Sequence, residues 1–472
     1  MGGKKHYIWN AVNKFGTEIL SFIGNILIAR TLMPEDYGLI AMLTIFINLA
    51  MGFSDSGFND GLIRKHDADK KDFGTIATFN VSIATFIYII LFLCSPLIAD
   101  FFQQPKLINI TRILGISIIL KAITLSGFVQ LNKELRFKDS TIINISCSIC
   151  SIAVTYALAI LGFSYWALVF QPIAVASFNI LFLLFIAKWR PYFCFHWNRF
   201  KPLFSYSSNL LISYIIGIIG DNLYGFIIGK FYSPTNLGHY NQAHKMQTVP
   251  TNGLNAIILT TSYPIIAKET DPDRRKKMYV SIFKKFNFLH SLLVFFLIGI
   301  SDFIFYYIFG EKWLPSSPLF KLFMILTLAY PMKTVNANIV KLVGKSNIYR
   351  NLTLLRTGLQ TTALLICAPI SINIILIGQI IAAFLSVSID MYVCGKQIQW
   401  NVTQQYKEWI KIIWIPLCSY IISLIIADNL STTILSQTII WLCCFLLSFT
   451  IICRITNSEN FIYFWNTFSK KH

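Results

Sequence analysis

Charged residues are scarce in this chain. Only 13% of its 472 residues are Asp, Glu, Lys or Arg, whereas 55% are hydrophobic, and the mean hydropathy is +0.61. So little charge cannot cover the surface of a water-soluble protein of this length. The apolar residues gather in runs of about 20, the length that crosses the hydrocarbon core of a bilayer. The composition therefore excludes a soluble protein and predicts a membrane protein with several spans.

Acidic residues are the scarcer of the two signs, with 21 Asp and Glu against 40 Lys and Arg, which gives a net charge of +19. The basic residues are spread over short segments between the apolar runs and form no continuous basic domain. Cytoplasmic loops that face anionic lipid have this pattern. We therefore expect membrane lipids as partners and no nucleic acid.

The residue patterns of enzymes and metal sites are also missing. Cys147 and Cys150 have CxxC spacing, but they lie inside an apolar run with no second Cys pair or His nearby, which indicates packing. The segments between runs are too short for a soluble domain. The connecting segments that are poor in Lys and Arg, which should face the outside, hold no cluster of Arg or His such as a membrane sugar polymerase or ligase needs. We expect no catalytic residues, no metal and no cofactor.

The apolar runs predict fourteen membrane-spanning helices, because a backbone in lipid must satisfy its hydrogen bonds internally. Lys and Arg concentrate in every second connecting segment, beginning with the N-terminal one, so the positive-inside rule places both termini in the cytoplasm. The predicted spans are 11–32, 38–62, 75–99, 107–131, 140–161, 164–187, 204–229, 238–266, 279–300, 317–343, 349–369, 371–395, 410–428 and 432–453.

The chain repeats itself at an offset of 200 residues. ILIARTLMPEDYGLI at 26–40 resembles FIIGKFYSPTNLGHY at 226–240, and both place a Pro and a Gly at matching positions. Six predicted spans, an even number, separate the two copies, so the halves have the same orientation in the membrane. Later the offset becomes 212 and relates Lys121 to Lys333.

The repeat predicts an all-α membrane fold with two six-helix lobes around a central cavity. The N-terminal lobe is 1–188 and the C-terminal lobe is 204–396. A cytoplasmic linker at 189–203 joins them, and 397–472 adds two helices and a tail.

One predicted span, within 238–266, is unusually polar. Its polar residues share one helical face, and Pro250 predicts a kink or a locally broken turn. A polar face at membrane depth needs either an aqueous cavity or polar protein neighbours. The second span repeats the pattern around Asn48 and Asp55, which favours the cavity. The stripe consists of Asn241, Lys245, Thr248, Asn252 and Asn255.

Three stretches resemble a known family. Ala29–Lys65, ARTLMPEDYGLIAMLTIFINLAMGFSDSGFNDGLIRK, resembles the first helix pair of bacterial polysaccharide exporters of the Wzx type, in the MOP superfamily of MATE transporters and lipid II flippases. Leu131–Asp139 (LNKELRFKD) and Phe309–Leu326 (FGEKWLPSSPLFKLFMIL) resemble the same subgroup, the colanic acid and teichuronic acid exporters.

The resemblance implies a flippase of the bacterial inner membrane. Such a protein moves an undecaprenyl-pyrophosphate-linked oligosaccharide repeat unit to the outer leaflet by alternating access, for O-antigen, capsule or exopolysaccharide synthesis. A polysaccharide polymerase or assembly machinery is the implied protein partner. The alternative is a MATE-type cation-coupled drug or metabolite antiporter, whose family implies twelve helices and a better-defined acid cluster.

A pyrophosphate in the membrane needs cations and hydrogen-bond donors around it. The candidate substrate-binding residues are Lys245, Lys121, Lys333, Arg356, Asn241, Asn252, Asn255 and Asn48. The alternative is that the lysines among them form structural ion pairs with Asp55, Asp221 or Asp390. Confined carboxylates can also hold a proton or Na⁺, and the candidates for a coupling ion are Glu18, Asp55 and Asp221. For Asp55 a structural role remains open.

Overall fold

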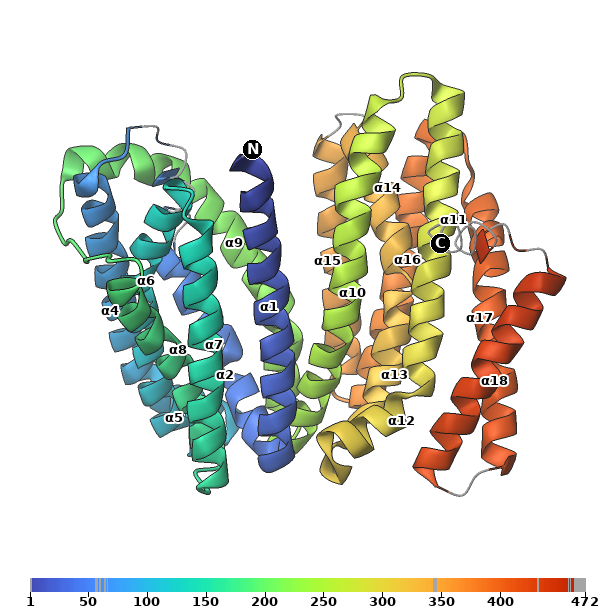
Figure 1. Ribbon diagram of the computed structural model, residues 1–472, viewed down its shortest axis with the longest axis horizontal. Coiled ribbons are helices and arrows are strands. Elements are labelled where there is room, and N and C mark those ends of the chain that lie inside the picture. Colours follow the sequence, from blue (N-terminus) through green and yellow to red (C-terminus); the bar gives the residue numbers. More distant parts are fainter. Residues whose placement is uncertain are drawn as a thin grey trace. The chain divides into compact units, whose positions relative to one another are not determined.

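A computed structural model describes residues 2–55, 58, 61–62, 65, 67–342, 346–430, 433–456, 458 and 460–461 (Figure 1). Within these residues, side chains are not described at 2–4, 7, 205–206, 208–210, 212–213, 221, 256–265, 341 and 346. Helices joined by turns make up the described chain, and none of its residues lies in a β-strand. The all-α prediction is confirmed.

Every predicted span coincides with one helix or with two consecutive helices. The long helices are α1 (Gly2–Thr31), α2 (Pro34–Asp55), α4 (Lys70–Phe102), α5 (Leu107–Leu114), α6 (Ile116–Lys133), α7 (Phe137–Ile160), α8 (Tyr165–Phe185), α9 (Trp197–Phe231), α10 (Pro234–Lys268), α11 (Pro272–Gly299), α13 (Ser316–Thr327), α14 (Tyr330–Leu342), α15 (Ser346–Cys367), α16 (Ile372–Ile398), α17 (Val402–Leu430) and α18 (Ile434–Ile455). A short α12 (Ser301–Phe303), a π-helical turn (Ile304–Phe309) and a 3-10 turn (Glu311–Trp313) connect α11 to α13.

Among the described residues, nine spans are long and apolar enough to cross a membrane by themselves. The remaining predicted spans are α1, α9, α10, α15 and the pair α13–α14. These helices carry many polar residues or are interrupted, so their hydropathy alone does not mark them. Polar helices of this kind are expected where a chain lines a cavity or packs against other polar helices.

Two predicted spans are broken at matching places in the repeat. The run 107–131 divides at Gly115 into α5 and α6, and the run 317–343 divides at 328–329 into α13 and α14. Lys121 and Lys333, which the repeat relates, then lie near the start of α6 and of α14. The break is therefore part of the repeated unit.

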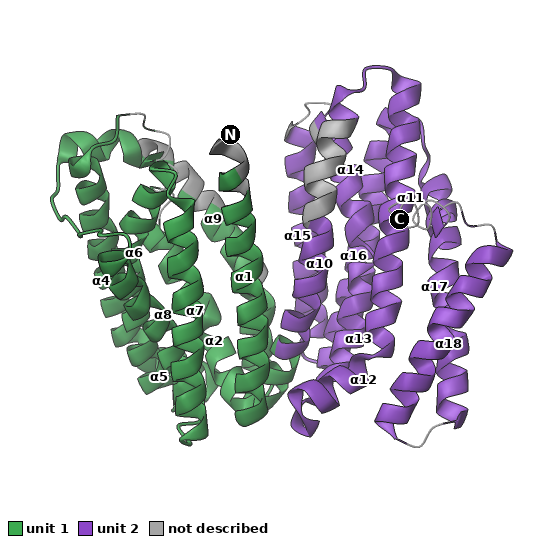
Figure 2. Cartoon of the chain, in the orientation of Figure 1, with its two compact units in different colours: residues 1–241 green, residues 242–472 purple. Residues whose placement is uncertain are grey.

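The chain forms two compact units, residues 1–241 and 242–472, whose boundary falls inside α10 (Figure 2). Unit 1 includes α9 because α9 packs along α2. These units are defined by the contacts between residues and do not follow the sequence repeat. The predicted division into parts therefore stays a prediction: the lobes at 1–188 and 204–396, the linker at 189–203 and the extension at 397–472. Each unit is described by itself.

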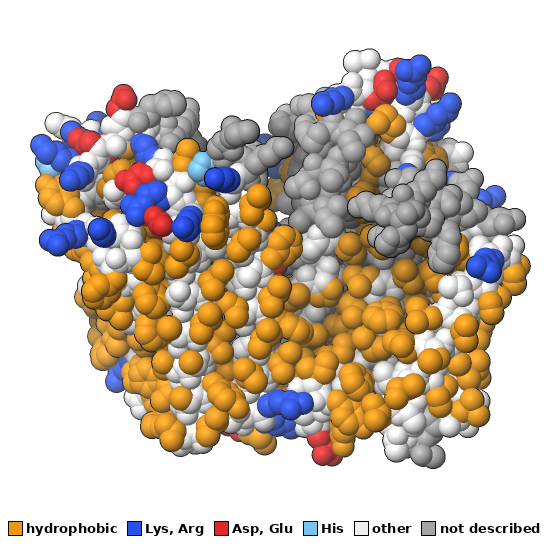
Figure 3. All heavy atoms as spheres, viewed as in Figure 1, with side chains coloured by type: hydrophobic (Ala, Val, Ile, Leu, Met, Phe, Trp, Pro, Cys, Tyr) orange, Lys and Arg blue, Asp and Glu red, His pale blue; other side chains and the backbone are white. Residues whose placement is uncertain are grey.

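In unit 1, α1 packs along α7 and α4 packs along α6. Cys147 lies in a hydrophobic cluster with Leu183 and Trp189, in agreement with a packing role. Leu93 and Leu97 on α4 are each 69% exposed, as lipid-facing side chains are. In the view of Figure 3, Lys, Arg, Asp and Glu side chains of unit 1 gather at its upper end and hydrophobic side chains cover the surface below.

Ion pairs fasten the start of α4 to the start of α9. Asp72 is buried and accepts from Lys65 at 2.7 Å, with Arg199 at 3.3 Å. Arg199 also pairs with Asp69, the N-cap of α4, and this hydrogen bond lowers the pKa of the Asp69 carboxyl to about 2. The ionised carboxylate stabilises the folded state when the pH is above about 4, the pKa of Asp in the unfolded chain. This stabilisation is lost as the pH falls toward 2. At neutral pH the junction is therefore charged and paired.

In unit 2, α17 and α18 form a helical hairpin that packs on α11. Phe288 of α11 lies in a buried cluster with Ile412 and Ile415 of α17 and Phe449 of α18. The helices α15 and α16 pack as a second pair, and α14 lies against α16. The pairing of α17 with α18 agrees with the prediction of two additional C-terminal helices.

The repeated Pro–Gly motifs contact each other inside unit 1. Pro34 and Pro234 are the first residues of α2 and α10, a position where proline costs no hydrogen bond. A Cβ added to Gly38 would lie 1.7 Å from the carbonyl oxygen of Pro234, and one added to Gly238 would lie 1.9 Å from that of Pro34. Each copy of the motif thus seats its glycine on the other copy's first turn.

We expect Gly38→Ala and Gly238→Ala each to lower the free energy of unfolding by about 3 kcal/mol or more. This is the upper end of the range for overpacking, because the atom that the new Cβ would meet belongs to the backbone and cannot move aside. The measurement is the melting temperature and the membrane abundance of each variant. Gly217→Ala is the control, since nothing lies within 4 Å of a Cβ there and alanine is favoured in a helix. Wild-type stability of both Gly38→Ala and Gly238→Ala would contradict the contact.

Candidate functional site

The predicted polar stripe of α10 lies on its more accessible side. Lys245 and Asn252 are exposed and Thr248 is half-buried, whereas Ala243 and Thr251 on other sides of the helix are fully buried. Asn241 and Asn255 are half-buried. The helix runs without interruption through Pro250, so the alternative of a broken turn there is wrong. An exposed ammonium and an exposed amide on one face of a membrane helix form a surface suited to a polar, anionic ligand.

Asn48 of α2 is hydrogen-bonded to a neighbouring helix. Its side-chain amide donates to the Oδ1 of Asn222 on α9 at 3.0 Å, and the Asn222 amide donates in turn to the carbonyl oxygen of Ile218. Asn48 is half-buried within unit 1. The α2–α9 contact therefore contains a polar pair in addition to apolar packing.

Lys121 and Asp55 line the same small cavity in unit 1. This cavity of about 60 Å³ is also lined by Met51 and Tyr214, and the Lys121 Nζ approaches the sulfur of Met51 at 3.4 Å. Lys121 is exposed and Asp55 is half-buried. A lysine beside a carboxylate fits both alternatives left open by the sequence, a cation for substrate and a structural pair.

The other two coupling-ion candidates differ in what the structure shows. Glu18 is exposed on α1, four residues after the exposed Lys14. The side chain of Asp221 lies outside the described residues. Within the described residues, no group of three or more His, Cys, Asp or Glu side chains is arranged as a metal site.

Arg356 belongs to a buried ion pair in unit 2. Its Nε and one terminal nitrogen both donate to the Oδ1 of Asp390, at 3.1 and 2.6 Å, and the two side chains are only 7% and 2% exposed. The Oδ2 of Asp390 is buried without a hydrogen-bond partner among the described residues. Lys333 is exposed on α14, and its charge also acts on Asp390. Arg356 is thus paired with Asp390, a contact that the sequence analysis did not consider for this arginine.

Two buried polar contacts of unit 2 escaped the sequence analysis. The Tyr279 hydroxyl donates to Asn336 Oδ1 at 2.9 Å, and a His290 ring nitrogen lies 3.1 Å from the Thr327 hydroxyl. Tyr279 and His290 are on α11, eleven residues apart, which places them on one helical face. This helical spacing of two polar residues within an apolar run is the sequence pattern that would have indicated a polar face on α11.

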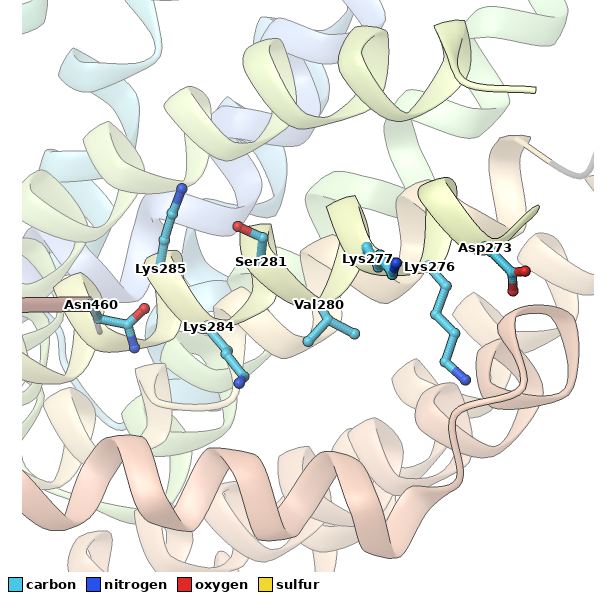
Figure 4. Close-up of a pocket in the computed structure, with 8 residues that line it drawn as sticks. All are labelled: Asp273, Lys276, Lys277, Val280, Ser281, Lys284, Lys285 and Asn460. Carbon is cyan, nitrogen blue, oxygen red and sulfur yellow. The ribbon is translucent and has the colours of Figure 1, made fainter. Parts of the chain in front are cut away.

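A basic cavity of about 730 Å³ lies along the first four turns of α11 (Figure 4). Lys276 and Lys284 extend from the same side of the helix with Val280 between them, whereas Lys285 and Ser281 point the other way. The Lys276 Nζ donates to the carbonyl oxygen of Gln399 at 2.7 Å, and Lys284 pairs with Glu408 at 3.1 Å. Four lysines and one aspartate line the cavity, so it attracts anions. Its lining consists of Asp273, Lys276, Lys277, Val280, Ser281, Lys284, Lys285 and Asn460.

Comparison with known proteins identifies the family. Residues 27–318 match the family described as "Polysaccharide biosynthesis protein", which is more than half of the chain. This chain belongs to that family. The resemblance seen in the sequence is confirmed, and the match includes unit 1 from residue 27 onward and the first part of unit 2.

Two relatives of this polysaccharide biosynthesis protein illustrate the likeness. It is 27% identical to the teichuronic acid biosynthesis protein TuaB of Bacillus subtilis over 65% of this chain and 63% of TuaB. It is 21% identical to the lipopolysaccharide biosynthesis protein WzxC of Escherichia coli over 91% of this chain and 87% of WzxC. The first of these matches thus spans less than two thirds of the relative's length.

Solved structures show that the family member has the fold of known membrane transporters. The lipid II flippase MurJ in an inward closed conformation superposes with a TM-score of 0.69 and 15% identity, covering 94% of this chain and 99% of MurJ. An inward-facing MATE multidrug transporter of the MOP superfamily gives a TM-score of 0.58 and 14% identity, covering 81% and 96%. The fold is shared, and the protein is a multi-pass membrane protein.

We expect Arg356→Ala to destabilise the protein by about 3–5 kcal/mol, because it leaves the Asp390 carboxylate buried without its partner. Asp390→Leu should have a similar effect, and the double variant Arg356→Met with Asp390→Leu should recover much of the loss. Melting temperature and membrane abundance are the measurements. An Arg356→Ala protein of normal abundance that fails only in transport would instead place this arginine on the substrate.

Proposed function

We propose that this protein is a flippase for an undecaprenyl-pyrophosphate-linked oligosaccharide repeat unit. The membership in the polysaccharide biosynthesis protein family carries the proposal. Relatives named for teichuronic acid, lipopolysaccharide and succinoglycan biosynthesis support it, as does the fold shared with a lipid II flippase. The likeness of this chain to a MATE-type antiporter is in fold alone.

The physical problem of this reaction is the pyrophosphate. An unpaired charge in a medium of low dielectric constant is costly, so a translocation path must offer cations and hydrogen-bond donors. Lys245 supplies an exposed ammonium in the first half of α10, and Asn252 supplies an exposed amide two turns further along the same face. A lysine binds phosphate as a point charge with three donors. This face is our candidate for the pyrophosphate and the first sugar.

The other candidates are now distinguished by their surroundings. Lys121 and Lys333 are exposed and remain candidate cations, whereas Arg356 is buried with Asp390. Asn241, Asn255 and Asn48 are half-buried, and Asn48 already donates to Asn222. We therefore rank Lys245, Lys121 and Lys333 above the rest as substrate contacts.

The same proposal includes location and energetics. We infer that the protein lies in the bacterial cytoplasmic membrane with both termini in the cytoplasm, that it works by alternating access, and that it hands its product to a polysaccharide polymerase or assembly machinery. We further infer that a proton or Na⁺ is the coupling ion. The exposed Glu18 and the half-buried Asp55 are the carboxylates we favour for it, since they are polar, accessible and confined to membrane helices.

Deleting the gene should make the lipid-linked repeat unit accumulate on the cytoplasmic leaflet, because synthesis continues while translocation stops. The measurement compares the labelling of the glycan in inside-out and right-side-out membrane vesicles. Re-expression of the wild-type protein is the control. Equal labelling of the outer leaflet with and without the protein would remove the flippase proposal.

Among point variants, we expect Lys245→Ala to abolish export at normal membrane abundance, Lys245→Arg to retain part of it, and Lys245→Glu to be at least as damaging as alanine, since it places a like charge beside the phosphates. Export per unit of membrane protein is measured in the leaflet assay. Lys268→Ala, an exposed lysine at the end of the same helix, is the control and should export normally.

The abundance of the alanine variant separates two roles. If Lys245 held a structural ion pair, its removal would leave a carboxylate without its partner and lower the abundance. An abundant and fully active Lys245→Ala protein would show that this residue does not bind the substrate.

A further inference from the structure

Unit 1 contains a second basic cavity, and none of the residues that line it belongs to α10. Its volume is about 430 Å³, within the range of cavities that bind small molecules. The start of α4, the end of α6 and the segment that follows α8 form its walls. In Figure 3 the charged side chains of unit 1 gather at this end.

The charges of this cavity are unbalanced. Its carboxylate, Glu134, accepts from Gln130 at 2.7 Å and lies 3.5 Å from Arg136. Arg136 is in turn held by Asp139 at 2.8 Å and by the carbonyl oxygen of Ala187 at 3.2 Å. Among the residues that the structure describes, three further cations that line the cavity have no acidic partner: Lys70, Lys188 and Arg190. An anion would complete this set.

A buried hydroxyl in the wall also lacks a partner. Ser126 of α6 lines the cavity, is 4% exposed, and its Oγ has no hydrogen-bond partner in the described part of the protein. Ser117 and Thr124 on the same helix do donate to backbone carbonyls one turn back. Buried hydroxyls are rarely left unsatisfied, so a group that accepts from Ser126 is expected in the cavity.

The wall after α8 is held in place by packing. The Trp189 ring lies against Gly127, where an added Cβ would come within 3.0 Å of it. Lys188, between the buried Ala187 and Trp189, has a φ of 54°, a left-handed conformation that is uncommon for lysine. The buried neighbours on both sides therefore hold the backbone of Lys188 in this conformation, while its side chain stays exposed.

Exposed aromatic residues continue directly from the cavity. Tyr192 lines it and is 50% exposed, and Phe193, Phe195 and Trp197 are 50%, 47% and 62% exposed. Aromatic rings next to Lys and Arg at the end of membrane helices are typical of the interface between headgroups and water. A ligand from the bilayer thus reaches the cavity more readily than one from bulk solvent.

We propose that this cavity binds the phosphate headgroup of an anionic membrane lipid, with Lys70, Lys188 and Arg190 around the phosphate and Ser126 donating to the headgroup. The site is separate from the proposed translocation face and does not depend on the transported substrate. Basic cavities at the ends of membrane helices recognise lipid headgroups by this chemistry.

The test is a titration of the full-length protein in detergent with monomeric short-chain phosphatidylglycerol, followed by native mass spectrometry and melting temperature. The triple variant Lys70→Gln, Lys188→Gln, Arg190→Gln should weaken binding on the order of 100-fold, since each cation near an anionic headgroup contributes a factor of about five. The matched control changes three exposed lysines of the same end that do not line the cavity, Lys71→Gln, Lys138→Gln and Lys201→Gln, and should bind as the wild type does.

Ser126→Ala separates a fitted site from general attraction between charges. It removes a hydroxyl that has no partner, so the lipid-free melting temperature should not fall, while binding should weaken about fivefold. Unchanged lipid affinity in Ser126→Ala, or equal losses in the two triple variants, would overturn the proposal. Equally tight binding of glycerol phosphate would assign the site to a soluble anion, and equally tight binding of phosphatidylcholine would exclude recognition of the anionic charge.

Discussion

The contact between the Pro34–Gly38 and Pro234–Gly238 motifs constrains how the starts of α2 and α10, the second helix of each repeat, are arranged. Each glycine lies so close to the opposite carbonyl oxygen that no side chain fits between the backbones. Such proximity requires that both helices begin at the same level, which the prolines at their first positions ensure.

The candidate cations on the membrane helices are of two kinds, buried in an ion pair or exposed. Arg356 and Asp390 are buried together, with two hydrogen bonds to one carboxylate oxygen, so the charge of the arginine is already paired. Lys121, Lys245 and Lys333 are exposed on helices that are otherwise apolar or amide-rich. An exposed cation can form new interactions at little cost, whereas a buried pair must first be broken. Burial therefore separates structural charges from candidate functional ones.

The sequence predicted the helices well because hydropathy and backbone hydrogen bonding dictate where a membrane chain is helical. It also predicted the Pro–Gly repeat and the accessible polar stripe on α10, since both depend on local spacing. It did not predict the break at Gly115 or at 328–329, where the hydropathy continues without interruption. Nor did it assign Arg356, because its partner lies 34 residues away on the next helix and only packing brings them together.

The two basic cavities extend this distinction to the ends of the helices. The cavity along α11 and the cavity between α4 and α6 each begin next to an aspartate N-cap, and in each the lysines outnumber the carboxylates. Lysines in an aqueous end segment cost little to keep unpaired, unlike those at membrane depth. A transporter of anionic lipids can therefore hold most of its positive charge at the membrane surface, where it attracts headgroups, and keep only a few cations along the helices. In the proposed translocation, too many cations along the path would bind the pyrophosphate so tightly that it could not leave, so a sparse set such as the candidates Lys121, Lys245 and Lys333 suits it better than a dense one.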